Sequence, residues 1–220
     1  MTSLPFQDRL EAARALAHRL SAYRGREGMI VLGLPRGGVP VAAEVARSLG
    51  AALDVLIVRK LGAPGQPELA VGAIASGGAR VLNDELVRML GLSSATITAI
   101  ADRESEELAR RERCYRADRP PPRLQGRCVL LVDDGLATGA TMCAAVRAVR
   151  QSGSARVVVA VPVAPPDTVE RLRQEADEVV CVATPEPFGA VGSWYRRFPQ
   201  VSDDGVIADL QAAWAEPPAG

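Results

Sequence analysis

The sequence contains little histidine, cysteine and aromatic residue. The one histidine among 220 residues, His18, lies in a helical pattern far from any motif, which argues against a hydrolase that depends on a Ser-His-Asp triad. The four cysteines form no CxxC pair, so a zinc site is not expected. Such sparse cysteines fit reduced thiols in a cytoplasm better than a disulfide framework.

Neither sign of charge is in excess, and long apolar runs are absent. Lys+Arg and Asp+Glu both total 26, for a net charge of zero, whereas a protein that mainly grips nucleic acid is usually basic. No apolar run approaches the length needed to cross a bilayer, and residues 1–20 lack the apolar core of a signal peptide. We therefore expect a soluble, cytoplasmic protein without a membrane partner.

The sequence does contain a regular alternation of apolar runs and helical patterns. Strands are predicted at 29–34, 53–58, 128–132, 156–161 and 179–182, and helices at 39–49, 84–90, 94–115, 138–151 and 167–176. Strands that are apolar throughout and separated by helices predict an α/β fold with a parallel sheet covered on both faces. Ligands bind such sheets beyond the carboxyl ends of the strands. The length fits one domain, residues 1–220, with 184–220 as the only candidate subregion.

Less regular segments lie between and after these elements. Residues 59–68 are rich in glycine and proline and are predicted to form a loop. Residues 69–75 and 79–83 flank a Ser-Gly-Gly turn, which predicts a hairpin. The charged helix at 94–115 is expected on the surface. A last helix, around 206–214, has one apolar face, and Asp203 is its expected cap.

The segment with the clearest chemistry is 129–141, VLLVDDGLATGAT. A buried strand ends at two acids, Asp133 and Asp134, and a helix then opens near Thr138. The amino end of a helix presents free N–H groups and a positive dipole, which suit a phosphate dianion. Gly139 lets the backbone approach that phosphate closely, and the hydroxyls of Thr138 and Thr141 add donors.

The two acids require a separate explanation, because they would repel a phosphate. They make sense if they accept hydrogen bonds from sugar hydroxyls or face a magnesium ion. Phosphate, sugar and magnesium together describe a phosphorylated ribose. The alternative is an ordinary turn with two surface acids and a threonine cap. The Thr-Gly-x-Thr sequence at this offset favours the functional interpretation.

The same segment resembles the ribose-phosphate signature of type I phosphoribosyltransferases. The resemblance implies a helix-flanked parallel sheet with a β-hairpin arm and a small C-terminal hood, phosphoribosyl pyrophosphate as donor, and Mg²⁺ as cofactor. It implies that Asp133 and Asp134 hold the ribose hydroxyls and the metal. The residues implied around the 5′-phosphate are Ala137, Thr138, Gly139, Ala140 and Thr141. Purine-salvage members have an aspartate where this chain has Ala137, so purine-type proton transfer is not expected at that position.

Two basic segments complete the resemblance. Residues 33–39, GLPRGGV, resemble the family's pyrophosphate loop, which implies that Arg36 and the amide of Gly37 bind the leaving group; the alternative is a glycine-rich turn. Arg59 and Lys60 are predicted to end the second core strand, at the same edge of the sheet, and 59–80 resembles the mobile catalytic arm. Cations aimed at the leaving pyrophosphate would lower the barrier. The alternative is a solvated pair.

An aromatic tail follows the last predicted strand. Four of the aromatic residues lie within 188–198, and this segment is similar to the hood of 6-oxopurine transferases. In this comparison, Phe188 of this chain occupies the place of the aromatic ring that stacks on the base in those enzymes. The alternative is that the aromatic rings of the tail pack it onto the core. Those enzymes read the oxo group with a lysine, which 161–166 lacks. The acceptor is therefore an unassigned base or amine.

The leading hypothesis is a phosphoribosyltransferase that releases pyrophosphate, a homodimer by analogy with the family. An alternative is a non-catalytic regulator that senses phosphoribosyl pyrophosphate and binds RNA or DNA, motivated by arginines at 110, 111, 113, 116, 119, 123 and 127. Acidic residues are mixed among them, so a solvated helix is favoured and nucleic acid is not the expected partner. A dinucleotide-binding oxidoreductase fails, because no strand is followed by GxGxxG.

Overall fold

The main sheet has five parallel strands. The computed structural model describes residues 4–117 and 119–215, and its main sheet has the order β2-β1-β6-β7-β8. The strands are β1 (Met29–Gly33), β2 (Ala52–Val55), β6 (Cys128–Val132), β7 (Arg156–Val163) and β8 (Glu178–Ala183). Every residue of β1 and β6 is buried, as expected for apolar strands covered on both faces. The predicted α/β class is confirmed.

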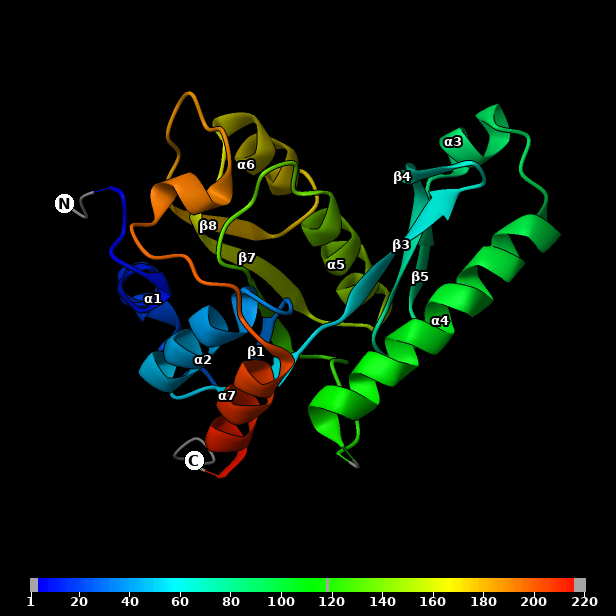
Figure 1. Ribbon diagram of the computed structural model, residues 1–220. Coiled ribbons are helices and arrows are strands. Elements are labelled where there is room, and N and C mark those ends of the chain that lie inside the picture. The colour runs from blue at the N-terminus through cyan, green and yellow to red at the C-terminus, as the bar shows by residue number, and fades with distance from the viewer. Residues whose placement is uncertain (1–3, 118, 216–220) are drawn as a thin grey trace.

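Helices cover both faces of this sheet (Figure 1). One face packs against α1 (Arg9–Arg19), α2 (Gly38–Leu49) and α7 (Asp203–Ala215), and the other against α5 (Ala140–Gln151) and α6 (Pro166–Arg173). Neighbouring residues of one strand serve opposite faces, as Val31 and Ile30 do. After β2 the chain leaves the main sheet and returns to it as β6, which pairs with β1 on the side opposite β2. The carboxyl ends of β1 and β6 therefore flank a topological switch point, where ligands of such sheets bind.

A second, antiparallel sheet forms the arm at the right of Figure 1. It consists of β3 (Val58–Ala63), β4 (Gln66–Ala75) and β5 (Arg80–Leu82), followed by α3 (Asp84–Met89) and α4 (Ser94–Arg116). The hairpin predicted around Ser76–Gly78 is confirmed. The loop predicted at 59–68 is wrong, because its first half is β3 and pairs with β4 around Pro64-Gly65. Glycine at position 62 is accommodated at a register shift.

The strand predicted at 53–58 is also shorter than expected. The core strand β2 ends at Val55, and the chain then passes into the arm. Arg59 and Lys60 consequently belong to β3 and do not end a strand of the main sheet. The helix predicted on the surface, α4, is only partly exposed, because Ile97, Ala101 and Leu108 on one face are buried.

The tail joins the N-terminal segment. Phe6 donates its amide to the Trp194 carbonyl at 2.8 Å and accepts from the Arg196 amide at 2.8 Å. Phe6, Tyr195 and Val163 form a small core, against which Phe188, Trp194 and Phe198 pack; we call this core, together with the tail segment 188–199, the hood. It includes a 3-10 turn at Val191–Trp194, and a second such turn, Ser21–Tyr23, follows α1.

The end of the tail runs back over the sheet as α7, and the subregion predicted at 184–220 extends past the described residues. The predicted cap of α7 is wrong. Ser202 Oγ accepts the amide of Gly205 at 3.1 Å, while Asp203 lies within the first turn and accepts the Tyr115 hydroxyl at 2.7 Å. No helix in the described ranges is both long and apolar enough to cross a membrane.

Candidate functional site

The two acids lie at the carboxyl end of β6, against the loop that follows β1. Asp134 is buried and Asp133 is half-buried. A Cβ atom at Gly37 would lie 2.0 Å from Oδ2 of Asp134, and one at Gly38 would lie 2.9 Å from Oδ1 of Asp133. Only glycine therefore allows the loop to approach the acids this closely. The structure brings together the two segments that the sequence singled out, at the switch point between β1 and β6.

Asp134 is held by residues far away in the sequence. Its Oδ2 accepts a hydrogen bond from Nε of Arg9 at 2.8 Å, and both side chains are largely buried. The guanidinium of Arg9 also lies 3.8 Å from the centre of the Phe198 ring and donates to the Pro199 carbonyl at 2.7 Å. The Tyr195 hydroxyl donates to the backbone carbonyl of Asp134. The hood thus contacts the backbone of this acid directly through Tyr195, and its side chain through Arg9 of α1.

Asp133 has a different environment. Its Oδ1 accepts the Asp134 amide at 2.8 Å, and within residues 4–117 and 119–215 it forms no ion pair. Burial raises the pKa of Asp133 well above its usual value, and repulsion from the Asp134 carboxylate adds to this rise. Burial also raises the pKa of Asp134, although Arg9 opposes that rise. Of the two neighbouring acids only Asp134 has a cationic partner among the described residues, so the pair is short of positive charge.

This shortage fits a magnesium ion that a ligand brings with it. The described residues contain no group of three or more His, Cys, Asp or Glu side chains that could hold a metal. Magnesium commonly keeps waters and binds one or two carboxylates together with substrate phosphates. The adjacent carboxylates of Asp133 and Asp134 match that kind of site better than an all-protein cage.

The loop between β6 and α5 contains a row of amides. Helix α6 fixes its outer side: Thr168 Oγ1 donates to the Ala137 carbonyl at 2.8 Å, and the Arg171 guanidinium donates to the Thr138 carbonyl. Because C=O and N–H point in opposite directions across a planar trans peptide, the amides of Thr138 and Gly139 face away from α6. In the described structure the amides of residues 137–139 donate to no other group.

The start of α5 continues this donor surface. Gly139 precedes the helix with φ +66°, and no side chain caps the helix. The first amides of a helix lack intrahelical partners and carry the positive end of its dipole. A Cβ at Gly139 would lie 2.7 Å from Cγ2 of Thr168, so glycine also permits α6 to pack here. The loop and the helix together can bind an anion beside the two acids. Ala140 and Thr141, at the exposed start of α5, lie on this surface as well.

The remaining predicted residues face other partners or lie on other elements. Arg36 is on the loop after β1, partly exposed, with Nη1 3.9 Å from Oδ1 of Asp203. Arg59 pairs with Glu104 of α4 at 2.5 Å, and Lys60 is exposed on β3. Their expected place at the edge of the main sheet is therefore wrong, because β2 ends before them. Phe188 packs against Trp194, with ring centres 6.0 Å apart.

Several residues of the site have no recognisable signal in the sequence. Arg9 and Asp134 are 125 positions apart, and Arg9 looks like any basic residue of an amphipathic helix. Thr168 and Arg171 do stand three apart on α6, so they share a helix face. That spacing could have marked them as partners of one loop, but nothing in it identifies the loop.

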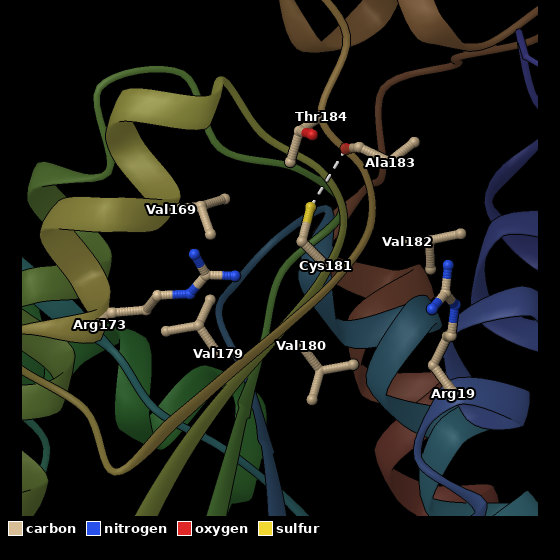
Figure 2. A pocket seen from close by; sticks show the side chains of 9 residues that line it. All are labelled: Arg19, Val169, Arg173, Val179, Val180, Cys181, Val182, Ala183 and Thr184. Atoms are coloured by element: carbon tan, nitrogen blue, oxygen red, sulfur yellow. Dashed lines mark hydrogen bonds between the residues drawn. The ribbon is translucent and has the colours of Figure 1, made fainter.

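A separate hollow of about 430 Å³ lies along the outer edge of β8 (Figure 2). Arg19 and Arg173 flank it from α1 and α6, and Cys181 points into it, with its thiol donating to the Ala183 carbonyl at 3.1 Å. Strand β7 separates β8 from β6 in the sheet. The hollow therefore does not belong to the site built around Asp133 and Asp134.

Comparison with known proteins gives a matching family model and several similar proteins. A model of the phosphoribosyl transferase domain family matches residues 6–193. Two proteins from Mycobacterium tuberculosis strains, provisionally named phosphoribosyl transferases, are each 54% identical over 208 residues. These matches cover 94% of the chain and 47% of each relative, so the chain spans about half the length of the curated relatives it matches. The crystal structure of TT1426 from Thermus thermophilus is similar, with 49% identity, a TM-score of 0.85, and coverage of 94% of this chain and 98% of that one.

Proposed function

Because the chain belongs to the phosphoribosyl transferase domain family, we propose that it transfers phosphoribosyl from magnesium-bound phosphoribosyl pyrophosphate to a nitrogenous base or amine. The observation that carries the proposal is that a loop suited to a phosphate and a pair of acids lie together at one switch point. Unpaired loop amides at 137–139 suit a phosphate. Two adjacent acids, only one of which has a cationic partner in the described structure, suit sugar hydroxyls and a metal. A phosphorylated ribose requires both.

The parts of the donor can be assigned to this chain's residues. The loop Ala137–Thr141 would hold the 5′-phosphate, and Asp133 and Asp134 would face the ribose hydroxyls and Mg²⁺. Arg36 and the amide of Gly37 would meet the pyrophosphate. When bound, the ion would offset negative charge on the leaving pyrophosphate. Arg59 and Lys60 would contribute only when the arm moves over the site.

The reaction needs little covalent chemistry from the protein. A nitrogen lone pair forms a bond to the anomeric carbon while the bond from that carbon to the pyrophosphate oxygen breaks. The developing charges are positive at the sugar and negative at the leaving group, so catalysis relies on positioning and charge stabilisation. Ala137 offers no acid or base to the acceptor, so a proton lost from the nitrogen must leave through another group or through water.

The acceptor, location and assembly are parts of the same proposal. The hood, including Phe188, would bound the acceptor side of the site. The four cysteines are free thiols, which supports a cytoplasmic protein, and we propose a homodimer. The regulator alternative gains no support: Arg110 and Arg111 both pair with Glu107, and Arg119 lies over Trp214, 4.6 Å from its ring centre.

The test is pyrophosphate release from phosphoribosyl pyrophosphate and Mg²⁺ with a panel of purines, pyrimidines and small amines. The proposal predicts acceptor-dependent release with at least one class. The control is the Asp133→Asn/Asp134→Asn variant, which should release none. If the wild type binds the donor tightly but turns over no acceptor, the protein is a sensor and not a transferase.

A further inference from the structure

Arg9 is a buried cation that joins the hood to the acid pair. Its side chain is 12% exposed, and three different partners surround its guanidinium. These are Oδ2 of Asp134 at 2.8 Å, the Pro199 carbonyl at 2.7 Å and the face of the Phe198 ring. A surface arginine that merely aids solubility would not be held on three sides.

We propose that Arg9 is a positioning residue of the donor site, which fixes the Asp134 carboxylate and leaves Asp133 as the acid that meets the ribose and its metal. This inference rests on the proposed function. Arg9 occupies one oxygen of Asp134, whereas Asp133 has no cationic partner in the described part of the chain. The two acids, equivalent in the sequence, therefore take different roles.

The contacts of the hood explain why Asp134 cannot move independently. Tyr195 donates to the backbone carbonyl of Asp134 and stacks on Phe198 with ring centres 4.8 Å apart. Phe198 in turn supports Arg9. One aromatic stack thus holds both parts of Asp134. Tyr195 binds its backbone carbonyl, and Phe198 supports the Arg9 guanidinium that binds its carboxylate. Any shift of the hood, such as one on acceptor binding, would move Asp134 and alter the donor site.

The same hood supplies a matched control. Arg197 pairs with Asp8 at 2.8 Å, and its side chain is 67% exposed. This pair also ties the tail to the N-terminal segment, but in the described structure no hydrogen bond or ion pair joins either residue to Asp133 or Asp134. Loss of Arg197 removes an arginine–aspartate pair from the hood without touching the acids.

The experiment measures the dissociation constant of Mg²⁺-phosphoribosyl pyrophosphate by calorimetry for the wild type, Arg9→Gln, Arg9→Lys and Arg197→Gln, with the melting temperature of each. Partners that orient ligand-holding residues typically contribute about 10–100-fold to affinity or activity. We expect Arg9→Gln to weaken donor binding at least about tenfold. Arg9→Lys should restore part of that loss, because it restores the charge but not the stacking. Arg197→Gln should bind like the wild type.

Each outcome separates the inference from the proposed function. If the wild type does not bind the donor, the proposed function fails, and the inference fails with it. If the wild type binds but Arg9→Gln binds equally well, only the inference is overturned. A purely structural role is also recognisable: donor affinity and melting temperature would then fall and recover together in Arg9→Gln and Arg9→Lys, and this result would overturn the inference. If Arg9→Gln does not fold, the comparison of Arg9→Lys with Arg197→Gln decides, and equal affinities would overturn the inference.

Discussion

Replacement of Gly37 by alanine tests the close packing of the first loop on the acids. Gly37 has φ −62° and ψ −30°, which any residue adopts, so the change introduces no backbone strain. The added methyl group would lie 2.0 Å from Oδ2 and 2.7 Å from Cγ of Asp134. The whole carboxylate would have to turn away, and its bond with Arg9 would be lost.

The size of the effect follows from the burial of that pair. Leaving one member of a buried ion pair unpaired costs about 3–5 kcal/mol. Burial already raises the pKa of Asp134. Loss of its hydrogen bond with Arg9 would raise this pKa further. An acid whose pKa is raised in the folded state lowers the protein's free energy of unfolding as the pH rises through that pKa. We therefore expect the deficit in the free energy of unfolding to be larger at pH 8 than at pH 5.

The assay is urea unfolding of the wild type and Gly37→Ala at both pH values, with donor binding measured in parallel. Gly205→Ala on α7 is the control, because its Cβ would lie 3.4 Å from the nearest atom, Ser202 Oγ. In a helix this change should be neutral or stabilising by up to about 1 kcal/mol. A Gly37→Ala protein with wild-type stability and wild-type donor affinity would refute the packing described here.

Three further predictions concern the loop, the arm and the thiols. Thr168→Val keeps the shape of the side chain but removes its hydrogen bond to the Ala137 carbonyl. It should lower the free energy of unfolding by about 1 kcal/mol and weaken donor binding in calorimetry. Unchanged affinity would show that α6 does not orient the loop. Asp54→Asn removes the buried anion of Arg116 and leaves the more exposed Glu112 as its remaining acidic partner, so it should cost about 3 kcal/mol. Glu175→Gln, in a more exposed pair with Arg147, should cost below about 1 kcal/mol. Equal urea midpoints would contradict this. Burial raises the pKa of Cys181 to about 11. At pH 8.5 iodoacetamide should therefore label the exposed Cys114 more than about tenfold faster than Cys181, as followed by mass spectrometry. Equal labelling rates would contradict this prediction.

The fold class and the meeting of the two loops at one edge of the sheet could be predicted because the motifs that indicate them are local in the sequence. An apolar strand, two acids and Thr-Gly-x-Thr occur together within 129–141, and each carries its own structural meaning. The glycine-rich loop at 33–39 was also singled out in the sequence, but its close packing on the acids through Gly37 and Gly38 is seen only in the structure. Parallel strands bring the loops that follow them to one edge, so local motifs were sufficient to place these two segments together.

Other features could not be predicted because they depend on contacts between distant segments. Arg59 and Lys60 follow an apolar run that looks continuous to Val58, and only the pairing of β3 with β4 moves them into the arm. Ser202 and Asp203 are both suitable caps, and the Tyr115 hydroxyl engages the second. Arg9 gains its role only when the tail folds onto the N-terminal segment.

The most direct test of the donor site is calorimetric titration with phosphoribosyl pyrophosphate in the presence of Mg²⁺. The wild type should bind one donor per chain, Asp133→Asn should bind far more weakly, and omission of Mg²⁺ should weaken binding to the wild type. The absence of binding to the wild type, or unchanged affinity in Asp133→Asn, would contradict the assignment of this acid pair and its amide loop to a phosphorylated ribose.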